Sequence, residues 1–115
     1  MSRRLLSAFF VVAGLNHFWH PRFYEAIVPP RLQSRRREVV VVSGIAEIVG
    51  GGAVLARPTR RLAGAYLVAL LAAVFPANLY MASVPERFSR YPRWTLYARL
   101  PFQPLMMRWA WRATR

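Results

Sequence analysis

The sequence lacks cysteine, lysine and aspartate altogether. Without cysteine the chain can form no disulfide, no CxxC redox pair and no iron–sulfur or zinc site held by thiolates, so any redox chemistry must come from a cofactor or a partner. It also has no nucleophile elbow and no paired carboxylates, and Gly50 to Gly52 lack the Lys and Ser/Thr that complete a phosphate-binding loop. We therefore expect no catalytic activity from the chain on its own.

The charge is strongly one-sided, with 17 arginines against four glutamates and a net charge of +13. Taken alone, this balance suggests nucleic acid, an anionic membrane surface or an acidic partner. The arginines, however, bracket apolar runs, and no recognised nucleic-acid motif accompanies them. We therefore expect no binding to nucleic acid, and a bilayer with anionic lipids as the partner. The bracketing groups are Arg3 and Arg4; Arg35, Arg36 and Arg37; Arg57, Arg60 and Arg61; and Arg108, Arg112 and Arg115.

Apolar residues make up 56% of the 115 residues, which is high for a small soluble protein. They form four runs of membrane length, at residues 3–20, 39–56, 62–83 and 94–112. The short link around Pro58 requires the second and third runs to be antiparallel neighbours. The fold prediction is an all-α, antiparallel four-helix transmembrane bundle, forming a single domain over residues 1–115. We expect it in a cell membrane, most simply a bacterial inner membrane.

The first and last runs each have an alternative interpretation. A basic start followed by an apolar stretch is typical of a signal peptide. The run has no A-x-A-like cleavage site, however, its tail carries Asn16 and His17, and further apolar runs follow, which favours a retained span. The last run is interrupted by Arg99, Pro101 and Pro104 and could instead lie on the membrane surface as an amphipathic helix. Aromatic residues at both of its ends favour spanning.

Between the first two runs, Pro21 and Pro29-Pro30 leave room only for a short helix around residues 23–28. Its aromatic residues suit a segment lying in the membrane plane, with the Arg35 to Arg37 group against anionic lipid, although a solvated loop explains those arginines equally well.

Small residues predict where the helices approach closely. Two stripes recur at every fourth residue: Ser43, Glu47 and Gly51, flanked by Ala46 and Gly50, and Ala65, Ala69, Ala73 and Ala77. Pro76 removes the hydrogen bond to the carbonyl of Ala72, and a neighbouring group should satisfy that acceptor.

Glu47 lies in the middle of an apolar run, where a carboxylate is costly and usually has a partner inside the bundle. In the antiparallel arrangement most other polar residues of the runs fall in the same half of the membrane, about 5 to 14 Å below one side. Arg99 then becomes the natural counter-ion of Glu47. The predicted polar cluster consists of Asn16, His17, Glu47, Asn78, Arg99 and Gln103.

This cluster allows more than one role. It could hold the register of the bundle and do nothing else. It could instead bind the polar head of a lipophilic ligand, such as a quinone, or relay a proton. His17 and His20 might be thought to hold a metal or haem, but no thiol or carboxylate ligand lies close by in sequence, so we expect no metal site.

Four strings, in this order and spacing, resemble the DoxX-like family of small four-helix membrane proteins: AGLNHFWHPRFYEAIVPP, SGIAEIVGG, VFPANLYMA and ARLPFQ. The resemblance covers nearly the whole chain. It implies that His17, Pro21, Glu47, Pro76, Asn78, Arg99 and Gln103 are the pattern residues, and the Arg35 to Arg37 group looks like an addition of this chain.

The family name comes from small subunits associated with quinone-linked sulfur oxidation, and relatives are regarded as organisers of membrane redox complexes. The resemblance therefore implies an accessory or ligand-binding subunit of a quinone-linked redox system, with subunits of that system or further copies of the chain as partners. The alternative is a purely structural or assembly protein without a ligand.

Overall fold

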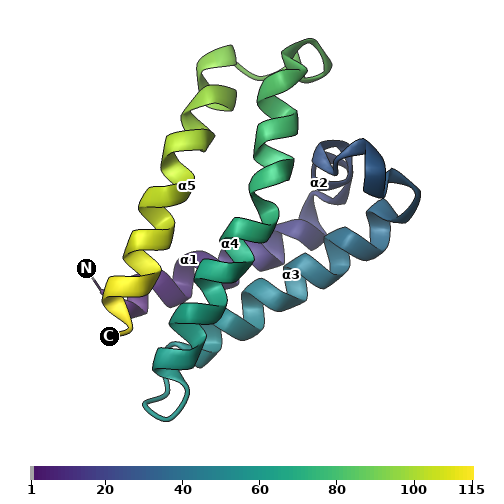
Figure 1. Cartoon of the computed structure of the whole chain (residues 1–115). Coiled ribbons are helices and arrows are strands. Elements are labelled where there is room, and N and C mark those ends of the chain that lie inside the picture. The colour runs from purple at the N-terminus through teal and green to yellow at the C-terminus, as the bar shows by residue number, and fades with distance from the viewer. Residues whose placement is uncertain (1) are drawn as a thin grey trace.

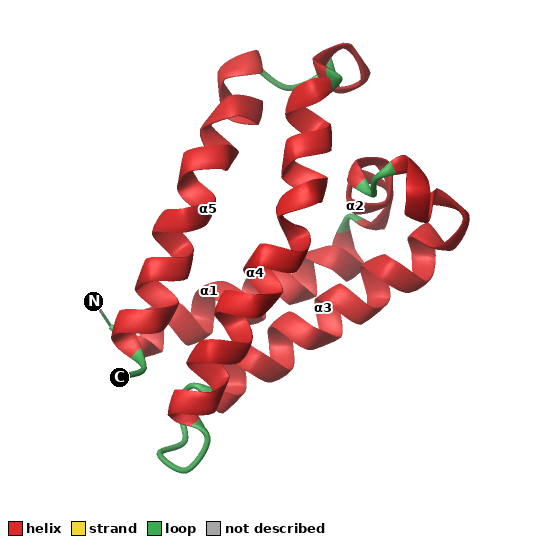
Figure 2. Cartoon of the chain, in the orientation of Figure 1, coloured by secondary structure: helices red, strands yellow, loops and turns green. Residues whose placement is uncertain are grey.

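The computed structural model describes residues 2–115, and within this range all regular elements are helices (Figures 1 and 2). Four of them are long, and one α-helix and two 3₁₀ helices are short. In chain order they are α1 (Arg3–Trp19), α2 (Pro21–Ile27), η1 (Pro30–Arg35), α3 (Arg36–Ala53), α4 (Arg60–Ser83), η2 (Pro85–Phe88) and α5 (Arg93–Ala113). The all-α prediction is confirmed.

The helix ends follow local sequence signals. The hydroxyl of Ser2 accepts hydrogen bonds from the backbone N–H groups of Arg4 and Leu5, at 3.1 and 3.3 Å, and so caps α1. Pro21 opens α2, where a missing N–H costs nothing. The short helix expected around residues 23–28 is α2, and each long helix coincides with one of the four predicted runs to within three residues at either end.

The long helices form two pairs: α1 packs mainly against α3, and α4 against α5. Figure 1 shows the two pairs close together at the end that holds both chain termini, and further apart toward α2. Each end has its own apolar core. The larger core, at the end with the termini, contains Leu6, Phe10, Val54, Ala63, Leu67, Leu71, Met106 and Ala110. The smaller core contains Ile27, Met81, Phe88 and Leu96.

Glycines set the close packing of α1 on α3. A Cβ atom on Gly14 would lie 2.6 Å from the carbonyl oxygen of Gly44, and one on Gly44 would lie 3.0 Å from the carbonyl oxygen of Gly14. Two turns further along α3, a Cβ atom on Gly51 would lie 3.1 Å from the carbonyl oxygen of Ser7. The close approach predicted for the small residues of α3 is therefore present. Its contact residues are Gly44 and Gly51, which are seven residues apart, and Ser43 is not one of them.

The alanine stripe of α4 packs inside the chain only at its end, where Ala77 contacts the smaller core. Ala65 and Ala69 are exposed, whereas Gly64 and Leu67 are buried. A Cβ atom on Gly64 would collide with the side chain of Thr114. The prediction that the alanines form the helix contact is therefore wrong for Ala65 and Ala69, because the inward face of this half of α4 is rotated by about one residue from that stripe.

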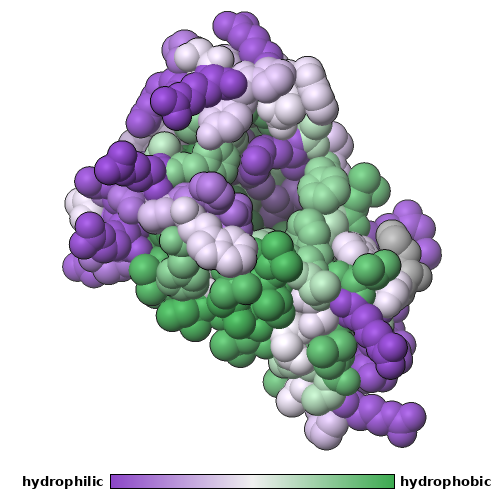
Figure 3. Space-filling view, turned by 180° about the vertical axis from the view of Figure 1, so that it is seen from behind, coloured by the Kyte–Doolittle hydropathy of each residue, from purple (hydrophilic) through white to green (hydrophobic). Residues whose placement is uncertain are grey.

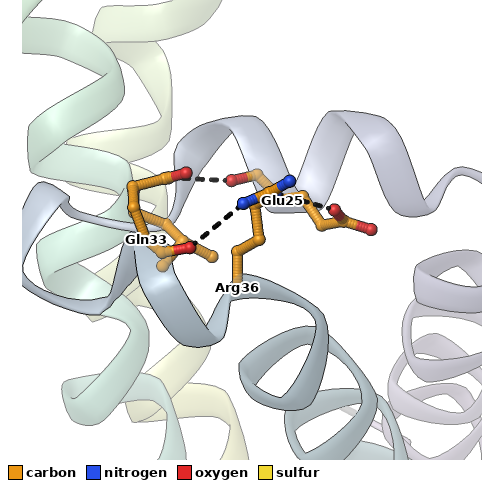
Figure 4. A network of polar contacts seen from close by, with 4 residues as sticks. Glu25, Gln33 and Arg36 are labelled. Carbon is orange, nitrogen blue, oxygen red and sulfur yellow. Dashed lines mark hydrogen bonds and ion pairs between the residues drawn. The ribbon is translucent and has the colours of Figure 1, made fainter.

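A polar network holds the turn between α2 and α3 (Figure 4). The amide of Gln33 donates hydrogen bonds to the backbone carbonyls of Glu25, at 3.0 Å, and of Val28. The Nε of Arg36 lies 3.2 Å from the Glu25 carboxylate. Gln33 of η1 thus binds the carbonyl end of α2, and Arg36 of α3 binds the Glu25 carboxylate, so that both contacts hold this short helix against η1 and α3.

Among the helices of residues 2–115, one is long and apolar enough to cross a membrane by length and composition, and it is α4. The other long helices are shorter or less apolar than α4. Helix α1 has 17 residues, α3 opens with the charged residues Arg36, Arg37 and Glu38, and α5 contains Arg99 and two prolines.

Candidate functional site

A cavity of about 530 Å³ lies where the two helix pairs separate, and all five α-helices contribute residues to it. Figure 3 shows a hollow in the middle of the face opposite to that of Figure 1, with hydrophilic residues inside it and hydrophobic residues beside it. Cavities of this size can enclose a small organic ligand. The lining is mostly apolar, and its polar members are His17, Tyr24, Ser43, Glu47, Asn78, Arg99 and Gln103. We call this the polar cavity.

His17 and Glu47 face each other across the α1–α3 contact. The Nδ1 atom of His17 donates a hydrogen bond to the carbonyl oxygen of Ala13, at 2.8 Å, and lies 3.5 Å from the Oε2 atom of Glu47. Because a carbonyl oxygen only accepts, Nδ1 carries the proton in the neutral ring and Nε2 is an acceptor. Glu47 is 8% exposed, and its Oε2 atom has no hydrogen-bond partner among residues 2–115.

Tyr24 of α2 covers this pair from the side. Its ring stacks on that of His17, with centroids 3.9 Å apart and planes 16° from parallel. The amide of Asn16 donates a hydrogen bond of 2.8 Å to the Tyr24 hydroxyl oxygen. Burial raises the pKa of the Tyr24 phenol above its ordinary value, although the Asn16 hydrogen bond opposes this change. The phenol is therefore a neutral hydroxyl group at physiological pH, able to donate into the cavity.

Asn78 and Gln103 join α4 to α5 on the opposite wall. The amide of Asn78 donates to the Oε1 atom of Gln103, at 2.6 Å, and the amide of Gln103 donates to the backbone carbonyl of Leu71. Pro76 lies inside α4 and cannot donate a backbone hydrogen bond. We expected a neighbouring group to bind the carbonyl of Ala72, which this proline leaves free. The Gln103 amide instead binds the preceding carbonyl, that of Leu71.

Arg99 does not pair with Glu47. Its guanidinium lies over the ring of Phe23, 5.4 Å from the centroid, and within residues 2–115 the basic side chain at ion-pair distance from the Glu47 carboxylate is His17, not an arginine. The predicted Glu47–Arg99 ion pair is therefore absent, although both residues line the polar cavity. The reason is the separation of the helix pairs: α5 packs on α4, so Arg99 reaches the aromatic residues of α2 and not α3.

Five of the six residues of the predicted cluster thus line one cavity, and the sixth, Asn16, contacts it through Tyr24. His20 is exposed while His17 is buried, so the two histidines do not form a common site. No three His, Asp or Glu side chains gather closely enough within residues 2–115 to hold a metal ion.

Sequence reasoning missed the roles of Phe23 and Tyr24, which it assigned to the membrane interface. The signal that could have identified them is the pair of prolines, Pro21 and Pro29. They confine α2 to two turns and force it to fold back beside the end of α1.

No curated protein and no solved structure matches the chain. One family model does match, that of the Domain of unknown function (DUF8561), over residues 6–114. This range includes the four long helices almost completely and every residue of the polar cavity. The chain therefore belongs to the DUF8561 family.

Proposed function

We propose that the chain is a multi-pass membrane protein whose polar cavity binds the head group of a lipophilic, quinone-like ligand, and that it serves as an accessory subunit of a membrane redox system. The observation that carries the ligand proposal is the Glu47 carboxylate. It is buried against His17 with one oxygen atom left without a hydrogen bond, and it lines a cavity large enough for a ring-sized head group. A buried carboxylate oxygen without a partner is costly unless something binds to it.

Apolar stripes on the outside of the helices support the membrane placement. On α3, Val42, Ile45 and Val49 are 65, 51 and 59% exposed and follow one another at helical spacing. On α1, Leu5, Val12 and Trp19 are exposed in the same way. Continuous apolar surfaces of this kind are rare on monomeric soluble proteins, and lipid would cover them.

Helix α4 also behaves unlike the core helix of a soluble protein, because only 22% of its apolar stretch is buried. Figure 3 shows hydrophilic residues gathered toward opposite ends of the molecule, with a hydrophobic zone between them. That distribution suits a bilayer, in which charged residues lie at the two surfaces.

The chemistry of the cavity suits a ring with oxygen substituents. The quinone carbonyls accept hydrogen bonds, for which Arg99 and the Tyr24 hydroxyl are donors, while the hydroxyl groups of the reduced form donate, for which Glu47 and the Nε2 of His17 are acceptors. The apolar lining from α3, including Val39 and Val42, suits a lipid tail. A bound quinone would supply the electron and proton transfer, and the residues of the chain would bind and orient it.

The resemblance of the four sequence strings to DoxX-like proteins supports the same class of function. The pattern residues that it implies are His17, Pro21, Glu47, Pro76, Asn78, Arg99 and Gln103. All of these except Pro21 line the polar cavity.

The membrane topology can be tested by cysteine accessibility, because the natural chain has no cysteine to interfere. Single cysteines near Arg35 and near Arg60 would be labelled from opposite sides of the membrane if α3 crosses it. Labelling of both from the same side would reject the crossing.

The ligand proposal can be tested by purifying the protein in mild detergent and identifying co-purified quinones by mass spectrometry. We expect Glu47→Gln to lower the quinone content at unchanged protein abundance. Glu38→Gln, which alters an exposed carboxylate on the same helix, is the matched control. Loss of abundance with Glu47→Gln, together with no quinone in the wild type, would instead favour the structural role.

A further inference from the structure

A second hollow lies between α1 and α5 at the end of the molecule that holds both termini. It adjoins the polar cavity and shares the lining residues Phe9, Phe102 and Met106 with it, but its charged residues are different. It has a volume of about 620 Å³. It exists because α1 and α5 touch only slightly, whereas each packs closely on its own partner helix. We call it the α1–α5 groove, and its lining residues are Phe9, Phe102, Leu105, Met106, Arg108, Trp109, Arg112 and Ala113.

The floor of this groove is aromatic. The ring centroid of Phe9 lies 6.3 Å from that of Phe102 and 6.3 Å from that of Trp109, so the three rings form one apolar surface. The indole Nε1 of Trp109 is buried, and it has no hydrogen-bond partner among residues 2–115.

The rim of the groove is positively charged. Arg108 and Arg112 are one helical turn apart on α5, both are exposed, and neither forms an ion pair or hydrogen bond within residues 2–115. No glutamate lies near them along the chain. Three of the four glutamates are Glu25, Glu38 and Glu86 at the opposite end, and the fourth is Glu47 in the polar cavity.

We propose that the α1–α5 groove binds one acidic phospholipid. The phosphate would lie between the guanidinium groups of Arg108 and Arg112, which match phosphate geometry and charge. The acyl chains would follow the apolar floor toward Phe102. Phe102 lies about 15 Å deeper than Arg112 along the helix axis.

The two parts of the groove together select this ligand class. A free phosphate would leave the apolar floor uncovered, and a zwitterionic lipid would bring its own positive charge to a rim that has two guanidinium groups and no carboxylate. The proposal relies on the membrane placement proposed above, but not on any ligand in the polar cavity.

Native mass spectrometry of the full chain, purified in detergent and freed of lipid, tests this site directly. The protein is titrated with phosphatidylglycerol or with phosphatidylcholine of the same acyl chains. We expect tighter binding of phosphatidylglycerol than of phosphatidylcholine, and a loss of about tenfold in phosphatidylglycerol affinity for Arg108→Gln/Arg112→Gln. Excess inorganic phosphate should not displace the bound lipid.

The control is Arg31→Gln/Arg90→Gln, which removes the same charge from exposed residues at the other end of the molecule and should bind phosphatidylglycerol as the wild type does. The proposal is overturned if this control loses as much affinity as the groove variant, if the two lipids bind equally well, or if phosphate displaces the lipid. Helix content from circular dichroism confirms that each variant is folded. The quinone content reports the polar cavity separately, so the failure of one site is distinguishable from the failure of the other.

Discussion

The Nδ1 atom of His17 lies 3.5 Å from the Oε2 atom of Glu47, and both side chains are about nine-tenths buried between α1 and α3. Because both groups are buried, replacing either side chain alters the electrostatic environment of the other. Arg99, the counter-ion that sequence alone suggests, lies instead over Phe23.

We therefore predict that Glu47 is energetically coupled more strongly to His17 than to Arg99. The variants Glu47→Leu and His17→Leu should combine non-additively, with a coupling free energy of about 0.5 to 3 kcal/mol. Glu47→Leu and Arg99→Leu should show a smaller coupling free energy, because the two residues line the same cavity but form no ion pair or hydrogen bond with each other. Unfolding of the four single and double variants in detergent measures both cycles. Stronger coupling of Glu47 to Arg99 than to His17 would contradict the observed arrangement.

The sequence was sufficient for the helices and for five of the polar residues that line the cavity, but not for Tyr24, because only the former depend on local patterns. Apolar runs with proline and arginine at their ends specify where a helix begins and ends, and α2 was expected from Pro21 and Pro29 alone. Polar residues inside apolar runs are few, so Glu47, Asn78 and Gln103 stood out.

The pairings inside the site could not be predicted, because they depend on the rotation and separation of the helices. A helical stripe identifies residues that share a face but not which face points inward. For this reason Ala65 and Ala69 of α4 were taken as a contact, whereas Gly64 and Leu67 occupy it. Likewise, Arg99 was close to Glu47 in depth but belongs to the other helix pair.

The α1–α3 contact gives a prediction about packing. Gly14→Ala should lower the free energy of unfolding by about 1 to 3 kcal/mol, because the new Cβ atom would lie 2.6 Å from the Gly44 carbonyl oxygen and 2.7 Å from the Ile48 side chain. Gly52→Ala is the control, since nothing lies within 4 Å of a Cβ there, and it should be neutral or stabilising. Thermal unfolding in detergent compares the two. Equal effects of the two substitutions would mean that α1 and α3 are not packed through Gly14.

The turn after α2 gives a prediction about which of its two polar side chains, Gln33 or Arg36, contributes more to the free energy of unfolding. Gln33→Ala should destabilise the protein by about 1 kcal/mol, because two backbone carbonyls, those of Glu25 and Val28, lose their donor. Arg36→Ala should cost less, since the side chain of Arg36 is 55% exposed and its ion pair with Glu25 is screened by water. The same unfolding measurement ranks the two variants, and a larger cost for Arg36→Ala would reverse this assignment.

The Tyr24 phenol gives a prediction about pH. Burial raises its pKa above the ordinary value of 10.0, so the folded protein holds this proton at a pH at which the unfolded chain releases it. The contribution to stability is complete below pH 10.0 and is lost as the pH rises through the folded pKa, because the unfolded state then binds fewer protons than the folded state. Tyr24→Phe, which keeps the stack on His17, should make stability less dependent on pH above 10.0. Tyr97→Phe, at a ring that is 48% exposed, is the control and should leave the wild-type pH dependence in place. Unfolding curves for the three proteins between pH 8 and about 11 provide the comparison. If Tyr24→Phe and the wild type lose stability in parallel, the buried phenol is not the group responsible.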